Sequence, residues 1–496
     1  MIGAQVGTIR AARIAGPGGE LLPDDGPVDI VLARGRIADI APTGVLRAVG
    51  EVLDVDGAWL VPGLWDHHVH VLQAALAGER VPLGHAASAA EAAALMGAAT
   101  PVDDRRVGTG FRDAFWADAP SLDLLDRATG EVPTYLINAD VHSVWLNSAA
   151  LRRERFPAPS DGVLREADAF EISRRLNAVD AAAGDRRVRA FAQAAAARGV
   201  VGIVDLDMAW NHDAWQRRVG DGFDALRIRY GIYPEHLDLA ISAGLRTGDP
   251  VDGDPSGLVR VGGLKVITDG SLGTRTAACS HAYGEGASHG VLTVDRETLL
   301  GLMTRATAAG LECAVHAIGD VANTAALDAF AATGASGSIE HAQLVRHADI
   351  PRFARLGVSA SVQPEHALDD RDLVDTVWDG QTAQPYPLRS LADAGANLLL
   401  GSDAPVTPLD PWAAMAGAVF RTRGGRSPWQ PHERVPFATA LAASTDGGSR
   451  ADSQIEPGAV ADLAVCATDP RAADETGLRG MEVRATLVAG RVTHAR

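Results

Sequence analysis

Residues 62–71, PGLWDHHVHV, begin the part of the sequence that decides the fold. Side chains alternate across a β-strand, so His68 and His70 share one face of this stretch together with Asp66. His67 points to the opposite face. Imidazole nitrogens are common zinc ligands. The stretch therefore predicts a strand that presents two histidines to one metal ion.

Stretches of strand length recur along the chain, and alanine-rich segments of helical length lie between them. The predicted strands are residues 63–71, 199–207, 226–234, 262–269, 312–318, 337–343, 358–364 and 397–405. Strands that alternate with helices indicate a parallel sheet, and eight is the number that closes a (β/α)8 TIM barrel. The sequence thus predicts the α/β class, with a metal-dependent barrel over residues 63–455.

The first gap between predicted strands is by far the longest, so roughly residues 74–190 are expected to form a large insertion at the barrel mouth. Its role is open between a lid and a contact in a homodimer. Residues 1–62 and 456–496 both show short alternating strands separated by turn residues. We expect these two segments to form one small composite β-sandwich from the N- and C-terminal segments.

Composition narrows the class of partner. The 496 residues are 47% hydrophobic and carry 45 basic against 63 acidic residues, a net charge of −18 without any basic run. Nucleic acid and anionic membranes are therefore not expected as partners, and a small-molecule substrate is. The beginning of the sequence lacks the apolar core of a signal peptide, and three scattered cysteines are too few for a disulfide framework. A cytoplasmic enzyme fits this pattern.

Further metal-type side chains end other predicted strands. His316 ends the fifth strand, His341 the sixth and Asp403 the eighth. Active sites of barrels are built at these carboxyl ends. A single histidine on a strand is more often structural, but four imidazoles and a carboxylate at strand ends favour a site for a divalent metal, with zinc the leading identity and one or two ions per chain.

Lys265, on the fourth predicted strand, is the only lysine in the sequence. An ammonium about 4 Å from a divalent ion would be repelled by about 8 kcal/mol even at an effective dielectric constant of 20. A buried lysine can instead lose its proton, and the neutral amine can add carbon dioxide to become an anionic carbamate that bridges two ions. Arginine cannot do this. The alternatives are a chance survivor of an arginine-rich composition and an ion pair with a carboxylate such as Asp269.

These residues lie in segments that resemble the amidohydrolase superfamily. PGLWDHHVH resembles its Pro-Gly-x-x-Asp-x-His-x-His opening. The segments LKVITDGSLGTRTA, HAIGD, IEHAQLV, SVQPEH, GSDAPV and IEPGAVADLAV resemble the YtcJ-like branch, which includes N-substituted formamide deformylases. The likeness runs from the first predicted sheet to the last, with the segments in family order.

The resemblance implies how the ligands divide between two ions. The first ion would be held by His68, His70 and Asp403, the second by His316 and His341, with Lys265 as the bridge. The segment NADVHSVWLNS resembles the lid motif of the branch and would place His142 near the substrate. Two positions depart from the branch: Val141 stands for the usual glycine, and Val321 for the usual arginine.

We therefore predict a metal-dependent hydrolase of a C–N bond in an amide, formamide, carbamate or cyclic amide. A metal-activated hydroxide would attack the carbonyl, and Asp403 would serve as general acid and base. His142 and His366 are candidates for binding the substrate or its tetrahedral intermediate. The first alternative is a mononuclear deaminase of a heterocycle, which would need a glutamate beside His316, whereas Glu312 lies at the start of that strand. The second is a barrel that binds a ligand without catalysis.

Overall fold

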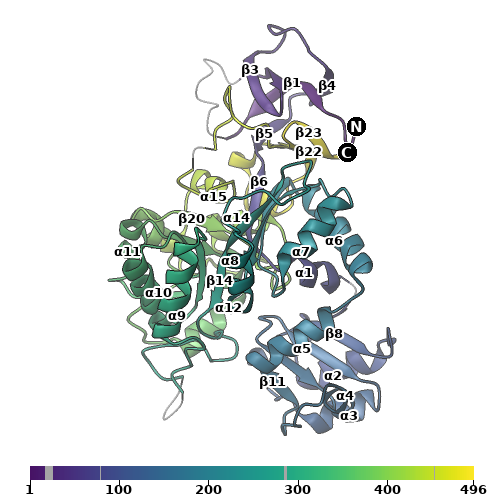
Figure 1. The fold of residues 1–496 in the computed structure, drawn as a ribbon, viewed down its shortest axis with the longest axis vertical. Coiled ribbons are helices and arrows are strands. Elements are labelled where there is room, and N and C mark those ends of the chain that lie inside the picture. The colour runs from purple at the N-terminus through teal and green to yellow at the C-terminus, as the bar shows by residue number, and fades with distance from the viewer. Residues whose placement is uncertain (17–25, 79, 284–287, 452) are drawn as a thin grey trace.

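The computed structural model describes residues 1–16, 26–78, 80–283, 288–451 and 453–496. A barrel occupies the middle of the molecule, and the chain ends lie beside a separate sheet at the opposite end from an inserted α/β segment (Figure 1). Among the described residues, no helix combines the length and apolar character that crossing a bilayer requires.

The barrel is a sheet of eight strands, and each contains residues of a predicted strand. In chain order these are β6 (Leu64–Val69), β12 (Val200–Asp205), β13 (Arg227–Ile232), β14 (Val259–Ile267), β15 (Cys313–Ala317), β16 (Gly337–His341), β18 (Ser359–Val362) and β20 (Leu398–Leu400). Neighbouring strands pair in parallel, and the first and last strands meet where Val69 and Ala404 form a bridge. The predicted fold class is confirmed.

Helices cover the outside of the barrel, because apolar runs such as VVGIVD on β12 are buried on both faces of the sheet. The helices around the barrel are α6 (Ala181–Ala196), α7 (Asn211–Gly220), α8 (Leu237–Ser242), α9 (Arg296–Ala308), α10 (Asp320–Thr333), α11 (Ile350–Leu356), α12 (Pro364–Val377), α13 (Leu388–Asp393), α14 (Pro411–Phe420) and α15 (Phe437–Ala443), and α16 (Glu475–Arg479) from the C-terminal segment packs against α14. Their apolar faces and the strands form one continuous core.

The insertion follows α1 (Val71–Ala77) and has a sheet of its own, with strand order β11-β10-β9-β8-β7. Its strands are β7 (Val81–Pro82), β8 (Arg106–Phe111), β9 (Thr134–Asn138), β10 (Ser143–Leu146) and β11 (Val163–Arg165), and its helices α2 (Ala89–Ala98), α3 (Leu122–Thr129), α4 (Ser148–Glu154) and α5 (Ala167–Asn177). The range predicted from sequence for this insertion includes the first part of α6, which packs against α1 and β12.

Both chain ends contribute to the remaining large sheet, whose strand order is β23-β22-β21-β5-β1-β2-β3 with β4 paired to β1. Its strands are β1 (Val6–Ile14), β2 (Val28–Ala33), β3 (Arg36–Pro42), β4 (Glu51–Asp54), β5 (Trp59–Pro62), β21 (Leu463–Cys466), β22 (Val483–Val488) and β23 (Arg491–Ala495). The inward-facing residues of both chain ends form one small core. The register Val61↔Ala464 joins the two ends directly before β6 enters the barrel.

Candidate metal centre and active-site cavity

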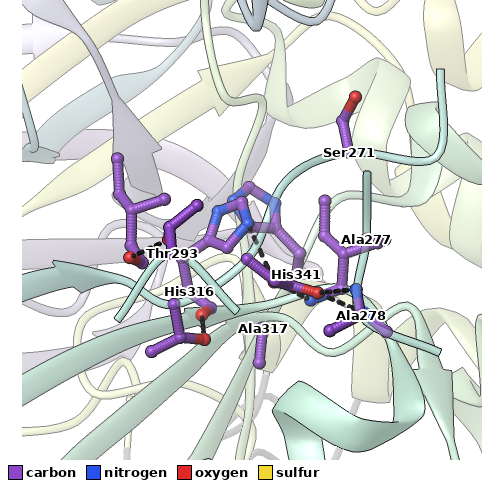
Figure 2. A network of polar contacts seen from close by, with 12 residues as sticks. Ser271, Ala277, Ala278, Thr293, His316, Ala317 and His341 are labelled. Carbon is purple, nitrogen blue, oxygen red and sulfur yellow. Dashed lines mark hydrogen bonds and ion pairs between the residues drawn. The ribbon is translucent and has the colours of Figure 1, made fainter. Parts of the chain in front are cut away.

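The structure brings the six predicted metal-binding side chains together at the carboxyl end of the barrel. All are buried; they are His68, His70, Lys265, His316, His341 and Asp403. Asp403 Oδ1 lies 3.2 Å from His70 Nε2 and 3.5 Å from His68 Nε2. The rings of His341 and His316 are 4.7 Å apart, centre to centre, and Figure 2 shows these two side chains next to each other.

Two of these side chains reach the centre through an unusual backbone. His341 has φ +73° and Asp403 has φ +56°, both in the left-handed region that residues with a Cβ rarely adopt. Both residues lie where a barrel strand ends. At Asp403 the backbone N–H donates a hydrogen bond to the carbonyl of His68, and this bond holds the left-handed conformation. Strained backbone of this kind is concentrated at functional sites.

The donor set fits a divalent cation. One ligand atom each from His68, His341 and Asp403 lies within 4.8 Å of the others. The buried atoms at the centre that have no hydrogen-bond partner include His316 Nε2 and Asp403 Oδ1. Unpaired buried polar atoms are costly unless a ligand satisfies them, and imidazole nitrogen with carboxylate oxygen is a combination that zinc binds.

Carboxylate and amide groups behind the histidines set their orientation. His68 Nδ1 donates to Glu340 Oε2 at 2.6 Å, and His341 Nδ1 donates to the amide oxygen of Gln363 at 2.8 Å. Burial lowers the pKa of His68 to about 4, so its ring is neutral. Each of the two rings therefore turns an unprotonated Nε2 toward the centre, which is the arrangement that outer carboxylates impose on metal-binding histidines.

Lys265 lies among these side chains, with its Nζ 3.4 Å from His68 Nε2 and only 1% of its surface exposed. Burial lowers the pKa of its ammonium. The alternative of an ion pair with Asp269 is not found: no such pair forms in the described part of the chain, because Asp269 has other partners. It accepts hydrogen bonds from three backbone N–H groups, and its Oδ1 lies 3.3 Å from His316 Nε2.

The two predicted substrate-binding histidines approach from different elements. His142 comes from the insertion, where its Nδ1 donates to Glu166 Oε2 at 2.9 Å, and its ring centre is 5.7 Å from that of His316. His366 lies on α12, with its Nε2 3.9 Å from Asp403 Oδ2. Both line the same cavity, together with His316, His341 and Asp403.

The two departures from the family pattern have different consequences. Val141 has φ +58°, so this loop adopts a left-handed conformation that suits glycine and is strained for a β-branched residue. Val321 lies on α10, packs against the barrel core and does not line the cavity.

Sequence reasoning missed several acidic residues that support the centre. Glu340 precedes His341 in the sequence, and its nearness to a predicted ligand was the only available signal. Asp66 was placed on the correct face, but its role is structural: Oδ1 accepts from the N–H of His68 and of Ser402, and so joins the first barrel strand to the last. Glu166 lies 24 residues from His142, and nothing in the sequence pairs them.

A second group of possible ligands lies outside this cavity. Ligand atoms of Cys279, His281 and Asp320 are within 4.8 Å of one another. However, Asp320 already accepts from the backbone N–H of Ser280 and from Arg346 Nε, both at 2.8 Å. Its charge is balanced without a metal, and we treat the group as structural.

The chain is similar to three known proteins over most of its length. The putative amidohydrolase YtcJ of Bacillus subtilis is 26% identical, over 90% of this chain and 90% of its own. The N-substituted formamide deformylase of Arthrobacter pascens is 25% identical, over 94% and 95%. The Arabidopsis thaliana protein LONG AFTER FAR-RED 3 is 28% identical, over 89% and 84%.

A solved structure, described as an uncharacterized metal-dependent hydrolase from Pyrococcus horikoshii, is 25% identical and superimposes with a TM-score of 0.78, covering 95% of this chain and 99% of the other. The profile described as the amidohydrolase family matches residues 51–494, which include the whole barrel, the insertion and almost all of the C-terminal strands. The candidate metal ligands lie at the carboxyl ends of the barrel strands, where active sites of this fold are built. We conclude that this chain belongs to the amidohydrolase family and is similar to its YtcJ-like branch.

Proposed function

We propose that the protein is a metal-dependent hydrolase that cleaves a C–N bond in an amide, formamide, carbamate or cyclic amide. The observation that carries this proposal is the convergence of buried imidazole nitrogens and the Asp403 carboxylate at the base of one cavity. Among these groups, His316 Nε2 and Asp403 Oδ1 have no hydrogen-bond partner. Membership of the amidohydrolase family supports the same chemistry.

The chain offers ligands for two ions, for which zinc is the proposed identity. His68, His70 and Asp403 would hold one ion, and His316 with His341 the other. Lys265 would lie between them as a carbamate formed with carbon dioxide, which its burial as a neutral amine favours. Divalent ions bound in this way lower the pKa of a water molecule toward about 7 and polarise a carbonyl group.

Asp403 is the residue placed to move a proton. Although burial opposes ionisation, the nearby imidazoles of His68, His70 and His341 keep the pKa of Asp403 well below its ordinary value, so it is a carboxylate at neutral pH. It can accept a proton from the attacking water and donate it to the departing nitrogen, a role worth about 10²–10⁴-fold in rate. His142 and His366 line the cavity on either side and would orient the substrate carbonyl.

The deaminase alternative has less support. It needs a glutamate beside His316, whereas Glu312 is exposed at the other end of β15. A barrel that only binds a ligand would have no need for all six metal-type side chains that are buried together at its carboxyl end.

The decisive experiment measures both metal content and turnover. The purified protein is reconstituted with zinc, its ions are counted by inductively coupled plasma mass spectrometry, and it is assayed against amides, formamides, carbamates, lactones and aminated heterocycles. We expect about two ions per chain and release of an amine, both absent after chelation. Asp403→Asn should lose about 10²–10⁴-fold in kcat, while Asp123→Asn, at an exposed site on α3, should not. One ion with ammonia release from a heterocycle would favour the deaminase, and no bound metal would overturn the proposal.

A further inference from the structure

The wall of the cavity away from the metal-type cluster is acidic. Besides Asp403, four aspartates line the cavity together with a single arginine. They are Asp113, Asp140, Asp369 and Asp370. The arginine, Arg112, is paired, because its Nη2 lies 2.7 Å from Asp369 Oδ2, and Arg423 also pairs with this aspartate. Within the described residues, none of the other three aspartates has a cationic side chain within 4.0 Å.

The ion pair between Arg112 and Asp369 explains why the carboxylates of Asp113 and Asp370 border the same cavity. Arg112 belongs to the insertion and Asp369 to α12, so their contact joins the insertion to the barrel. Asp113 and Asp370 are the next residues along each segment, and both border the cavity. Each is held by a neutral donor: Asn138 Nδ2 donates to Asp113 at 2.8 Å, and the hydroxyl of Tyr386 donates to Asp370 at 2.6 Å. Burial raises the pKa of both carboxyl groups, which a bound cation would offset.

The cavity wall also contains a buried hydrogen-bond acceptor without a donor, the side-chain amide oxygen of Gln343. The side chain of Gln343 is buried, with 4% of the residue exposed, and it lines the cavity with an amide oxygen that has no partner. Tyr386 links it to Asp370, because the backbone N–H of Tyr386 donates to the carbonyl of Gln343 and its hydroxyl donates to that aspartate, and both linked residues line the cavity. A buried acceptor without a donor is unfavourable, and a ligand N–H would satisfy it.

We propose that Asp113, Asp370 and Gln343 form a subsite for a positively charged nitrogen, so that the preferred substrates carry an ammonium or guanidinium group apart from the C–N bond that is cleaved. This inference rests on the proposed hydrolase function and adds the charge of the substrate. The carbon part of such a molecule would contact the apolar side chains of Phe115 and Leu373, which border the same cavity. An anionic group at this position would be disfavoured, because it would face Asp113 and Asp370.

The test compares three formamides of equal chain length: a monoformylated diamine, a formylated alkylamine and a formylated amino acid. The zinc-loaded protein should show kcat/KM values that fall in that order, with the cationic compound about ten- to a hundredfold above the neutral one, as expected for a hydrogen-bonded charge pair. Asp370→Asn and Asp113→Asn should each reduce this ratio at least about threefold. Asp372→Asn, on the same helix but exposed and outside the cavity, should leave the ratio unchanged.

The outcomes separate this inference from the proposed function. If none of the amides, formamides or carbamates is hydrolysed, the proposed function fails. If formamides are hydrolysed but the neutral or anionic compound is preferred, or if Asp370→Asn leaves the ratio unchanged, the cationic subsite is refuted while the hydrolase stands. Should the variants not fold, inhibition of the wild-type enzyme decides: an alkylguanidinium must inhibit more strongly than the alcohol of equal length, and equal inhibition would refute the subsite.

Discussion

The carboxylate of Asp269 offers the sharpest test of how the centre is held. This residue follows β14, has no exposed surface, and joins three chain segments. Its Oδ1 accepts from the N–H of Ile318 at 3.0 Å, and its Oδ2 accepts from those of Ala278 and Gly319, both at 2.9 Å. The replacement Asp269→Asn keeps the size of the side chain but turns one acceptor oxygen into an NH₂ group.

The expected cost follows from these bonds. In the better of its two orientations, asparagine retains the oxygen that faces Ala278 and Gly319 and sets an NH₂ group against the N–H of Ile318. At least one hydrogen bond to a charged acceptor is lost, which costs about 2–3 kcal/mol. Alanine would leave all three N–H groups unpaired at about 3–9 kcal/mol, comparable with a total stability of about 5–15 kcal/mol, so asparagine is the informative variant.

Urea unfolding of the chelator-treated protein measures this effect without any contribution from bound metal. The matched control is Asp123→Asn, whose side chain is 76% exposed. We also expect weaker zinc binding, because the NH₂ group would donate to His316 Nε2 and occupy its lone pair. If the free energy of unfolding of Asp269→Asn stays within about 0.5 kcal/mol of wild type, the three hydrogen bonds do not hold this region and the reasoning is wrong.

Three further predictions concern other parts of the molecule. Glu340→Gln should weaken zinc affinity about 10–100-fold, because His68 loses its charged acceptor; competition with a chelator dye measures this, and unchanged affinity would contradict it. Lys265→Arg should bind about one ion fewer per chain, since a guanidinium cannot form a carbamate, and elemental analysis that finds full loading would rule out the bridge. Asp185→Asn should lower the free energy of unfolding at pH 7, because the hydrogen bond from Arg217 keeps the pKa of Asp185 below 3.8 despite burial. That contribution is present above pH 3.8 and is lost as the pH falls through the lower folded-state pKa, so the difference from wild type should shrink in acid unfolding curves, and a constant difference would contradict it.

Much of the fold could be predicted because its signals are local. Each barrel strand is an apolar run of its own, bounded by helical segments, and the pair of His68 on β6 and His70 just after it follows from the alternation of side chains. The internal sheet of the insertion was not predicted in detail, since its short strands and helices share no strong period. The correct face was assigned to Asp66, but only the structure shows that its carboxylate closes the barrel seam at Ser402.

The sequence by itself determined the class of the protein: eight strand-length runs, histidines and an aspartate at their ends, and one lysine in 496 residues. The tertiary structure alone decided which groups meet. Glu340 reaches His68 across 272 positions of sequence, and Arg112 reaches Asp369 across 257. The physical reason is that periodicity is set by neighbouring residues, whereas these contacts exist only after the barrel has closed and the insertion has docked on its mouth. The left-handed backbone conformation of His341 is also decided by the tertiary structure, because only the packed surroundings of a strained residue hold it in that conformation.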